Sequence, residues 1–297
     1  MNKKVAVIGG LGFIGKHVVE NLKQNGFDVI TLGRSTKNDV YFDLSKRKSI
    51  ITALTNYKTD FIVHLASPSL KRLYRYPKVK SDKDINKTIC AEINGSYTIF
   101  ATAKKLGVKK IVYTSSAMVY GKNNRNIPFV ENMIPKPHTL YGAIKFSIET
   151  IGRVAFPELI NLRLFHVFGP GDLKNRLIPY VMNASKSSEL LLTPCLQISD
   201  TIYVKDVAEC IRQILLDDSI PPDNYNLGTG KPIQLRKIVE LILKIRGIKI
   251  IPNYKRGYNK DIVKYSFADM CLLYKVCKWR PSYSLEEGIC DMLSSEK

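Results

Sequence analysis

Long apolar runs are missing from this sequence, and its cysteines and histidines are few and scattered. No stretch approaches the ~18 apolar residues that a membrane-spanning helix needs. The six cysteines include no CxxC pair, and the four histidines are dispersed, so metal-ligand spacing is missing as well. We therefore expect no membrane insertion and no metal site. Scattered cysteines of this kind fit a cytoplasmic protein whose thiols stay reduced.

The N-terminal apolar run is also too short for a secretory signal. Val5–Ile8 follows two lysines, but Gly9 and Gly10 end the run after four residues. A signal peptide needs a longer apolar region. We expect this segment to be a buried first strand.

Acidic residues are scarce relative to basic ones. The 297 residues include 26 Asp and Glu against 46 Lys and Arg, which gives a formal net charge of +20 at pH 7. Such a field attracts polyanions, so nucleic acid and anionic membrane surfaces have to be considered. The basic residues are spread along the chain, with their densest cluster between Lys71 and Lys87. A lysine-rich surface and a small anionic substrate explain this better than nucleic-acid binding.

Apolar runs of strand length alternate with helical patterns over the first half of the chain. The expected strands are Lys4–Ile8, Phe27–Leu32, Asp60–Leu65, Lys110–Thr114 and Leu159–Leu164. The expected helices are Gly12–Asn25, Lys46–Tyr57, Asn86–Leu106 and Tyr141–Phe156. Strands that are almost wholly apolar and separated by helices predict a parallel sheet covered on both faces. With right-handed crossovers this is a doubly wound α/β sheet.

Prolines become frequent and the elements shorter after about residue 165. The sequence therefore predicts a dinucleotide-binding Rossmann domain over 1–165 and a smaller, mixed substrate-binding region over 166–297. No low-complexity linker separates them, so we expect the two parts to pack as one body.

A glycine-rich loop, Gly9–Gly15, follows the first strand and opens the first helix. Its glycines permit a tight turn and a close approach of a pyrophosphate, while the helix N-terminus supplies amide donors. A purely structural turn is the alternative. The flanking strand and helix favour dinucleotide binding, and no lysine follows to suggest a P-loop. The expected contacts are Gly9, Gly12, Phe13, Ile14 and Gly15.

The end of the second strand bears on the choice of cofactor. An acidic side chain there would bind the adenosine ribose and favour NAD(H), but this chain has Gly33 followed by Arg34 and Ser35. Arg34 and Ser35 could bind a 2′-phosphate, so we favour NADP(H), with NAD(H) possible. Asp43, with Leu44 after it, is expected at the adenine.

A serine-rich strand end and a Tyr-x-x-x-Lys spacing complete the pattern. Ser115 and Ser116 follow the strand at 110–114, where doubly wound sheets bind ligands. Tyr141 and Lys145 lie one helical turn apart on one face. A phenol titrates near pH ~10, but a neighbouring ammonium stabilises its phenolate and allows proton exchange at neutral pH.

Together these motifs resemble the extended short-chain dehydrogenase/reductase family, specifically its NAD(P)-dependent nucleotide-sugar epimerase, dehydratase and reductase branch. The resemblance covers nearly the whole chain. Its further motifs are His64-Leu-Ala66, Ile93-Asn-Gly-Ser96, Leu162–Gly171, Leu177-Ile-Pro179, Asp200–Val207, Asn226–Gly230 and Trp279–Gly288.

The resemblance implies a role for each matching residue of the reaction centre. Tyr141 would be the acid/base, and Lys145 would orient the nicotinamide ribose and stabilise the phenolate. Ser116 would bind the sugar hydroxyl or ketone, and Asn94 would support the site from its helix. Leu65, Ala66 and Ser115 would add cofactor contacts.

The substrate would be a nucleoside-diphosphate sugar used in surface polysaccharide precursor synthesis. His166 would lie near the sugar and Arg256 would contact the diphosphate. The resemblance also implies a homodimer formed through the helices Asn86–Leu106 and Tyr141–Phe156. Relatives carry Arg-Asp-Phe where this chain has Ser199-Asp-Thr201, and asparagine where it has His166. These departures leave the nucleotide and the sugar open.

The residues after Ser116 exclude one of the reactions that this family catalyses. Relatives that catalyse 4,6-dehydration carry Asp-Glu there, whereas Ala117 and Met118 cannot transfer a proton. A reductase and an epimerase remain. Because the signal at Arg34 favours NADPH, we expect a 4-ketoreductase acting on a nucleotide-linked 4-keto-6-deoxyhexose; the alternative is an NAD-dependent 4-epimerase. A non-catalytic RNA-binding relative is disfavoured, because it has no reason to keep serine, tyrosine and lysine in register.

Overall fold

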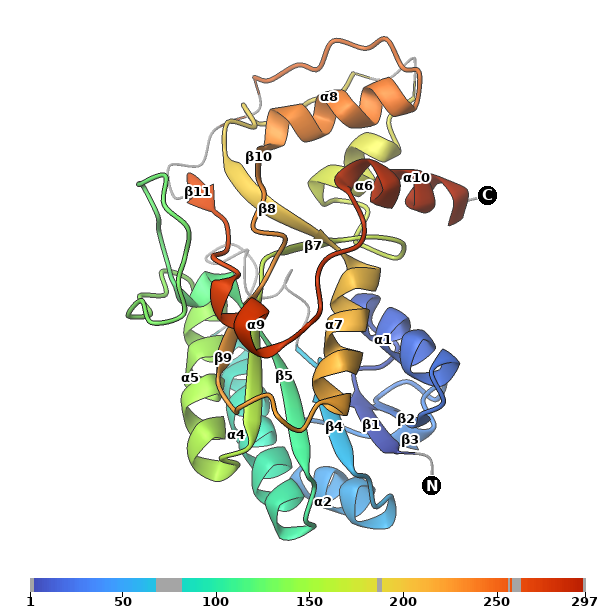
Figure 1. Cartoon of the computed structure of the whole chain (residues 1–297), viewed down its shortest axis with the longest axis vertical. Helices are drawn as coiled ribbons and strands as arrows, with labels where there is room; N and C mark the ends of the chain where they lie inside the picture. Colours follow the sequence, from blue (N-terminus) through green and yellow to red (C-terminus); the bar gives the residue numbers. More distant parts are fainter. Residues whose placement is uncertain (1–2, 68–81, 186–188, 256, 258–262, 296–297) are drawn as a thin grey trace.

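Seven parallel strands form the large sheet, which confirms the predicted parallel α/β sheet and adds two strands to the five expected. A computed structural model describes residues 3–67, 82–185, 189–255, 257 and 263–295. Within these, the strand order is β3-β2-β1-β4-β5-β6-β9 (Figure 1). The strands are β1 (Lys4–Ile8), β2 (Asp28–Gly33), β3 (Val40–Tyr41), β4 (Phe61–His64), β5 (Lys110–Ser116), β6 (Leu159–Leu164) and β9 (Asn224–Leu227).

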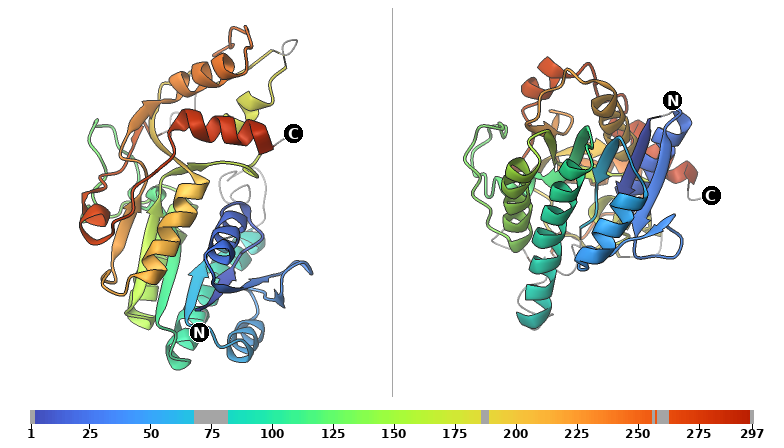
Figure 2. Two further views of the ribbon diagram at one scale, coloured as in Figure 1. Left: turned by 45° about the vertical axis from the view of Figure 1, so that its right-hand side comes forward. Right: turned by 90° about the horizontal axis from the view of Figure 1, so that it is seen from below.

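Helices cover both faces of this sheet because its strands are apolar on both sides. In β1, Val5 and Val7 belong to one hydrophobic cluster, whereas Ala6 and Ile8 belong to the other. The covering helices are α1 (Phe13–Gln24), α2 (Arg47–Asn56), α4 (Asp82–Lys105), α5 (Leu140–Ala155) and α7 (Val204–Leu216). α1 packs against α7 on one face of the sheet. On the other face α4 packs between α2 and α5, and Figure 2 shows these three helices in a row.

A smaller mixed sheet and short helices form the rest of the described chain, drawn above the large sheet in Figure 1. In this sheet β8 (Ile198–Tyr203) pairs with β7 (His166–Phe168), β10 (Pro232–Gln234) and β11 (Tyr265–Ser266). Its helices are α6 (Leu177–Met182), α8 (Leu235–Ile245) and α10 (Leu285–Ser295), whereas α9 (Cys271–Val276) packs against β9 of the large sheet.

The chain crosses between the two sheets more than once. β9 and α7 come after residue 166 in sequence, yet β9 extends the large sheet beside β6 and α7 packs on α1. The division into 1–165 and 166–297 therefore stays a prediction about folding units. In space, the later part of the chain supplies both an edge strand and a covering helix to the earlier part.

A buried ion pair fastens α5 to β6. Arg163 and Glu149 are each only 2% exposed, and an Arg163 Nη2 to Glu149 Oε2 distance of 2.8 Å joins them. Arg163 also donates to the Tyr120 hydroxyl at 3.0 Å and to the Glu131 carbonyl at 3.1 Å. The pair thus fixes the helix that carries Tyr141 and Lys145 against the sheet.

Three further findings concern the described part of the chain. It has no helix long and apolar enough to cross a bilayer. It has no cluster of His, Cys, Asp and Glu that could hold a metal ion. All six cysteines fall within it and are free thiols, three of them buried.

Candidate active site

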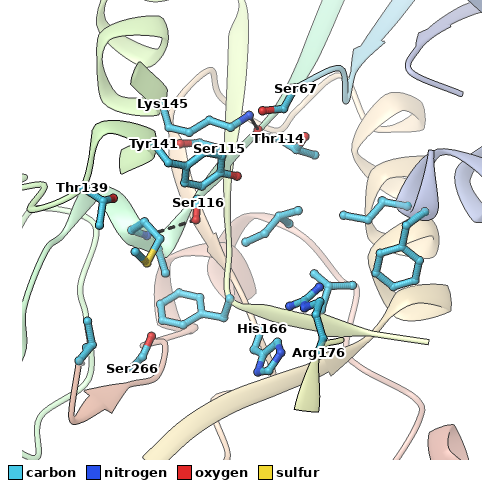
Figure 3. A pocket seen from close by; sticks show the side chains of 18 of the residues that line it. Ser67, Thr114, Ser115, Ser116, Thr139, Tyr141, Lys145, His166, Arg176 and Ser266 are labelled. Atoms are coloured by element: carbon cyan, nitrogen blue, oxygen red, sulfur yellow. Dashed lines mark hydrogen bonds between the residues drawn. The ribbon is translucent and has the colours of Figure 1, made fainter. Parts of the chain in front are cut away.

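A cavity of about 1480 Å³ lies at the carboxyl ends of the large sheet's strands, facing the smaller sheet (Figure 3). Doubly wound sheets bind ligands at this edge. The structure brings many of the predicted site residues into its lining: Gly9, Gly12, Phe13, Ile14, Gly15, Leu65, Ser115, Ser116, Tyr141, Lys145 and His166. Ala66 lies just outside this lining and packs on the backbone of Gly9.

The glycine loop fits a pyrophosphate. A Cβ added to Gly15 would lie 2.2 Å from the Gly9 carbonyl oxygen, so only glycine lets the helix start so close to the loop. Gly12 caps α1 without a side chain, and the first turn holds no acidic residue. The first amides of α1 therefore face the cavity with neither a side-chain cap nor a negative charge to compete with a phosphate.

Tyr141 enters the cavity from the first turn of α5. Thr139 caps this helix, with its Oγ1 accepting from the Gly142 amide at 3.1 Å. Ser116 ends β5, and its Oγ accepts from the Met118 amide at 3.2 Å. Figure 3 shows the Tyr141 ring and the Ser116 hydroxyl pointing into the same space. A phenolate there is also favoured by the positive end of the helix dipole.

Gly142 allows α5 to approach the short 3₁₀ helix η1 (Ala117–Val119) closely enough for this arrangement. A Cβ at Gly142 would lie 2.4 Å from the Met118 carbonyl oxygen. We expect Gly142→Ala to push α5 outward, separate Tyr141 from Ser116 and lower kcat by about tenfold or more, since small misplacements of reacting groups are costly. Steady-state kinetics checks this. The control for general destabilisation is Gly107→Ala, where a Cβ meets nothing within 4 Å but the φ of +71° disfavours alanine, at a position that does not line the cavity; equal losses in kcat would contradict the prediction.

Lys145 lies one turn further along α5 and is almost wholly buried, at 2% exposure. Its Nζ donates to the Thr114 carbonyl at 2.9 Å and lies 5.7 Å from the centre of the Tyr141 ring. Burial lowers the pKa of Lys145, and the negative charges of Glu92 and Glu149 act in the opposite direction. The lysine can therefore stabilise the Tyr141 phenolate, provided that its own charge is maintained.

The residues predicted for the adenosine end do not line the cavity. Arg34 and Ser35 are exposed after β2. Asp43 accepts from the Ser45 amide at 3.0 Å and from its hydroxyl at 2.7 Å. Burial acts to raise the pKa of Asp43, but these hydrogen bonds and the charges of Lys46 and Arg34 outweigh it, so the net shift is downward. The structure thus places Arg34 and Asp43 near each other at the edge of the sheet.

Two further predicted residues, Leu44 and Asn94, lie against α4 or on it. Leu44 packs against α4 at Gly95. Asn94 does not reach the cavity, because its side chain is exposed on the outer face of the helix. Glu92, two positions earlier, faces inward and is 2% exposed. Two helical positions differ by about 200°, so only one of the pair can face the core. The sequence offered a signal for Glu92, which lies on the same helical face as Ser96 and Ile99, both buried.

The opposite wall of the cavity is polar. His166 lies beside Arg176 (Figure 3), and removal from water together with the Arg176 charge lowers the pKa of His166 to about 3. This imidazole is therefore neutral at physiological pH. Arg176 Nη1 lies 3.0 Å from Asp172 Oδ1, while Asp172 Oδ2 is buried and has no hydrogen-bond partner among the described residues. Sequence reasoning missed Asp172 and Arg176, which sit in a loop without regular spacing. The predicted contact Arg256 lies outside the described residues.

The fold and this site define the class as an extended short-chain dehydrogenase/reductase. The model of the NAD dependent epimerase/dehydratase family matches residues 5–228, well over half of the chain. The chain belongs to this family, and it is an NAD(P)-dependent enzyme of the nucleotide-sugar epimerase and reductase type. The resemblance read from the sequence is thereby confirmed.

Individual relatives cover almost the whole chain at modest identity. The dTDP-4-dehydro-6-deoxyglucose reductase of Escherichia coli is 24% identical to this chain, and the match covers 98% of this chain and 96% of the reductase. The UDP-glucose 4-epimerase 4 of Oryza sativa subsp. japonica is 27% identical, over 96% of this chain and 88% of its own. The crystal structure of the UDP-glucose 4-epimerase of Thermotoga maritima with UDP-glucose has a TM-score of 0.86 at 24% identity, covering 98% of this chain and 97% of its own.

Proposed function

We propose that this enzyme is an NADPH-dependent 4-ketoreductase of a nucleoside-diphosphate-4-keto-6-deoxyhexose, acting in the cytoplasm in the synthesis of surface polysaccharide precursors. The observation that carries the proposal is the end of β2, where Gly33 and the exposed Arg34 stand in place of a carboxylate. A reductase consumes its cofactor at every turnover, and NADPH is the reductant that such an arginine would select.

The residues at the reaction centre fit reduction of a ketone. A bound nicotinamide would supply the hydride for C4 of the sugar. Tyr141 would donate the proton to the C4 oxygen, and Ser116 would hold that oxygen through its hydroxyl. Lys145 would bind the nicotinamide ribose and keep the Tyr141 phenolate stable after the proton has left. Ala117 and Met118, which also line the cavity, have no group that could remove water from the sugar.

The opposite wall fits the sugar and its diphosphate. Asp172 lines the cavity, its Oδ2 has no hydrogen-bond partner among the described residues, and Arg176 lies beside it. We propose that Asp172 binds a sugar hydroxyl, that neutral His166 packs near the sugar, and that Arg256 contacts the diphosphate. The strongly basic chain favours such an anionic substrate electrostatically.

The absence of a carboxylate at the end of the second strand supports NADP(H) over NAD(H). A Cβ at Gly33 would meet only the flexible Asn38 side chain, at 2.7 Å from Nδ2, so the support comes from the residue types at Gly33 and Arg34 and not from lack of space. We propose that Arg34 and Ser35 bind the 2′-phosphate and that Asp43 with Leu44 borders the adenine. Arg34 stays well solvated at this edge and can form charge-assisted hydrogen bonds to a phosphate.

Removing the Arg34 side chain should weaken NADPH binding selectively. We expect Arg34→Ala to raise the Kd for NADPH by about tenfold, the value of one charge-assisted hydrogen bond, and to change the Kd for NADH by less than about twofold. Thermal-shift titrations with both cofactors measure this, because a ligand stabilises the protein according to its Kd.

The matched control is Lys37→Ala, which removes an exposed cation from the same loop. It should leave the NADPH to NADH ratio unchanged. An Arg34→Ala variant that kept its NADPH preference would contradict the assignment of Arg34.

The proposed reaction is tested by following NADPH absorbance with a panel of UDP-, GDP-, CDP- and dTDP-4-keto-6-deoxyhexoses. Oxidation of NADPH with one nucleotide series would support the reductase. If no panel member consumed NADPH and UDP-sugars were interconverted without added cofactor, the enzyme would be an epimerase instead.

The NAD-dependent 4-epimerase is the second candidate, favoured by the likeness to the rice and Thermotoga proteins. A tightly retained cofactor in the purified protein would support it. A non-catalytic RNA-binding role remains the least favoured candidate. Filter binding to RNA over a salt series tests it, since phosphate contacts give a steep salt slope.

We also propose that two copies associate through α4 and α5. Tyr97 on α4 is 52% exposed and Val154 on α5 is 81% exposed, and α4 packs beside α5. Pairing of these helices with those of a second copy would bury both side chains. Sedimentation velocity should show a dimer, and Val154→Asp should shift it toward monomer.

A further inference from the structure

Lys145 needs a positive charge to stabilise a Tyr141 phenolate, but it lies in a buried environment that disfavours the charged form. The ammonium is removed from water, and it donates a hydrogen bond to the neutral carbonyl of Thr114. The faces of two rings, Tyr113 at 4.6 Å and Tyr141 at 5.7 Å, give it weaker support. Burying an ammonium without a compensating negative charge is costly and drives the group toward its neutral form.

The titratable groups on the neighbouring strands supply no negative charge. His64 on β4 is fully buried, and burial together with the Lys145 charge lowers its pKa to about 3, so it stays neutral. Tyr113 on β5 is also buried, and burial raises its pKa well above the usual range. Tyr141 on α5 cannot be counted as a compensating charge, because Lys145 is proposed to stabilise its phenolate.

Two carboxylates act on Lys145, and one of them is already neutralised. Glu149 lies on α5, but its carboxylate receives the Arg163 guanidinium through contacts of 2.8, 3.1 and 3.3 Å. Its charge is therefore largely cancelled. Glu92 on α4 is the other carboxylate. Among the described residues it makes no ion pair within 4.0 Å with Arg, Lys or His.

Glu92 is buried on α4, the helix that packs against α5, which carries Lys145. Ser67, which lines the cavity after β4, donates to Glu92 Oε2 at 3.4 Å. Burial raises the pKa of Glu92, whereas the positive charge of Lys145 and the hydrogen bond from Ser67 act to lower it. Each of the two buried groups thus makes the charged state of the other less costly.

We propose that Glu92 is a positioning residue that keeps the Lys145 ammonium protonated in the dry interior and thereby sets the pH range over which Tyr141 can work. Glu92 acts through Lys145 and makes no contact with substrate. A glutamate on the inner face of α4 therefore belongs to the proton-transfer machinery.

The test is to titrate Lys145 itself by NMR in protein labelled with ¹³C at the lysine Cε, a readout that does not depend on which reaction the enzyme catalyses. Lys145→Met assigns the signal. We expect Glu92→Gln to lower the Lys145 midpoint by about one pH unit or more, a tenfold loss of proton affinity. Glu92→Asp should recover part of the shift. Asn94→Asp, a charge change on the exposed face of α4, should leave the midpoint unchanged.

A reciprocal titration covers the case in which Glu92→Gln does not fold. Coupling between two sites is symmetric, so removing the ammonium should raise the Glu92 midpoint by the same amount as removing Glu92 lowers that of Lys145. The ¹³Cδ signal of Glu92 in Lys145→Met measures this. An unchanged midpoint in either experiment would overturn the proposal.

The kinetic counterpart is a pH profile. Glu92 becomes protonated on acidification, so the native enzyme and Glu92→Gln should have kcat values within about twofold at pH 6. At pH 8 they should differ by about three- to tenfold, because the variant has lost the charge of Lys145. A merely structural defect would instead lower kcat equally at every pH.

Discussion

Replacing Tyr141 with phenylalanine should lower kcat by about 10²- to 10⁴-fold, the usual contribution of a positioned acid/base. The substitution removes the hydroxyl that we propose passes a proton to the substrate oxygen, while the ring keeps its place in the first turn of α5. Lys145 keeps its hydrogen bond to the Thr114 carbonyl, so the cofactor pocket should survive. Steady-state kinetics combined with cofactor titration measures both quantities.

The control is Tyr57→Phe, an exposed tyrosine at the end of α2. It should change kcat by less than about twofold, because a solvated hydroxyl far from the cavity takes no part in proton transfer. A Tyr141→Phe enzyme with near-native kcat and cofactor affinity would show that another group transfers the proton.

Replacing Arg163 with methionine should destabilise the protein by about 3–5 kcal/mol, because it leaves the Glu149 charge buried without a partner. Both side chains are 2% exposed, so water cannot take over from the guanidinium. Urea unfolding followed by the fluorescence of Trp279, the single and fully buried tryptophan, measures the free energy of unfolding.

Two companion variants separate the charge effect from packing. In the double variant Arg163→Met with Glu149→Leu, stability should return to within about 1–2 kcal/mol of native, since no uncompensated charge remains. Lys109→Ala removes a surface pair with Asp60 and should cost less than about 1 kcal/mol. Equal losses in Arg163→Met and Lys109→Ala would contradict the role given to the buried pair.

The sequence predicted the elements that hold the reacting groups, since strand and helix periods are strong where apolar residues are buried on both faces. Ser116, Tyr141 and Lys145 meet at one cavity because the motifs fix both their spacing and the ends of the elements that carry them. The prediction for α4 was weaker. Its start at Asp82 lies four residues before the expected one, and helix ends carry little periodic signal.

Contacts between distant segments were beyond the sequence. Family likeness pointed to Asn94, whereas the helical period puts Glu92 on the inner face of α4. The proposed effect of its charge on Lys145 depends on the packing of α4 against α5, which the sequence does not give. Asp172 and Arg176 also meet the cavity through the crossing of the chain from β6 into the smaller sheet. Hydrophobic periodicity predicts which face of a single helix or strand is buried, but it does not predict which two elements pack together.

The most direct test of the proposed reductase follows the hydride. NADPH carrying deuterium at C4 of the nicotinamide is incubated with the enzyme and the nucleotide-4-keto-6-deoxyhexose panel, and the sugar product is analysed by mass spectrometry. A product one mass unit heavier, with deuterium at C4 and one NADPH oxidised per molecule, is the predicted result. An unlabelled product formed without loss of NADPH would contradict the reductase and favour the epimerase.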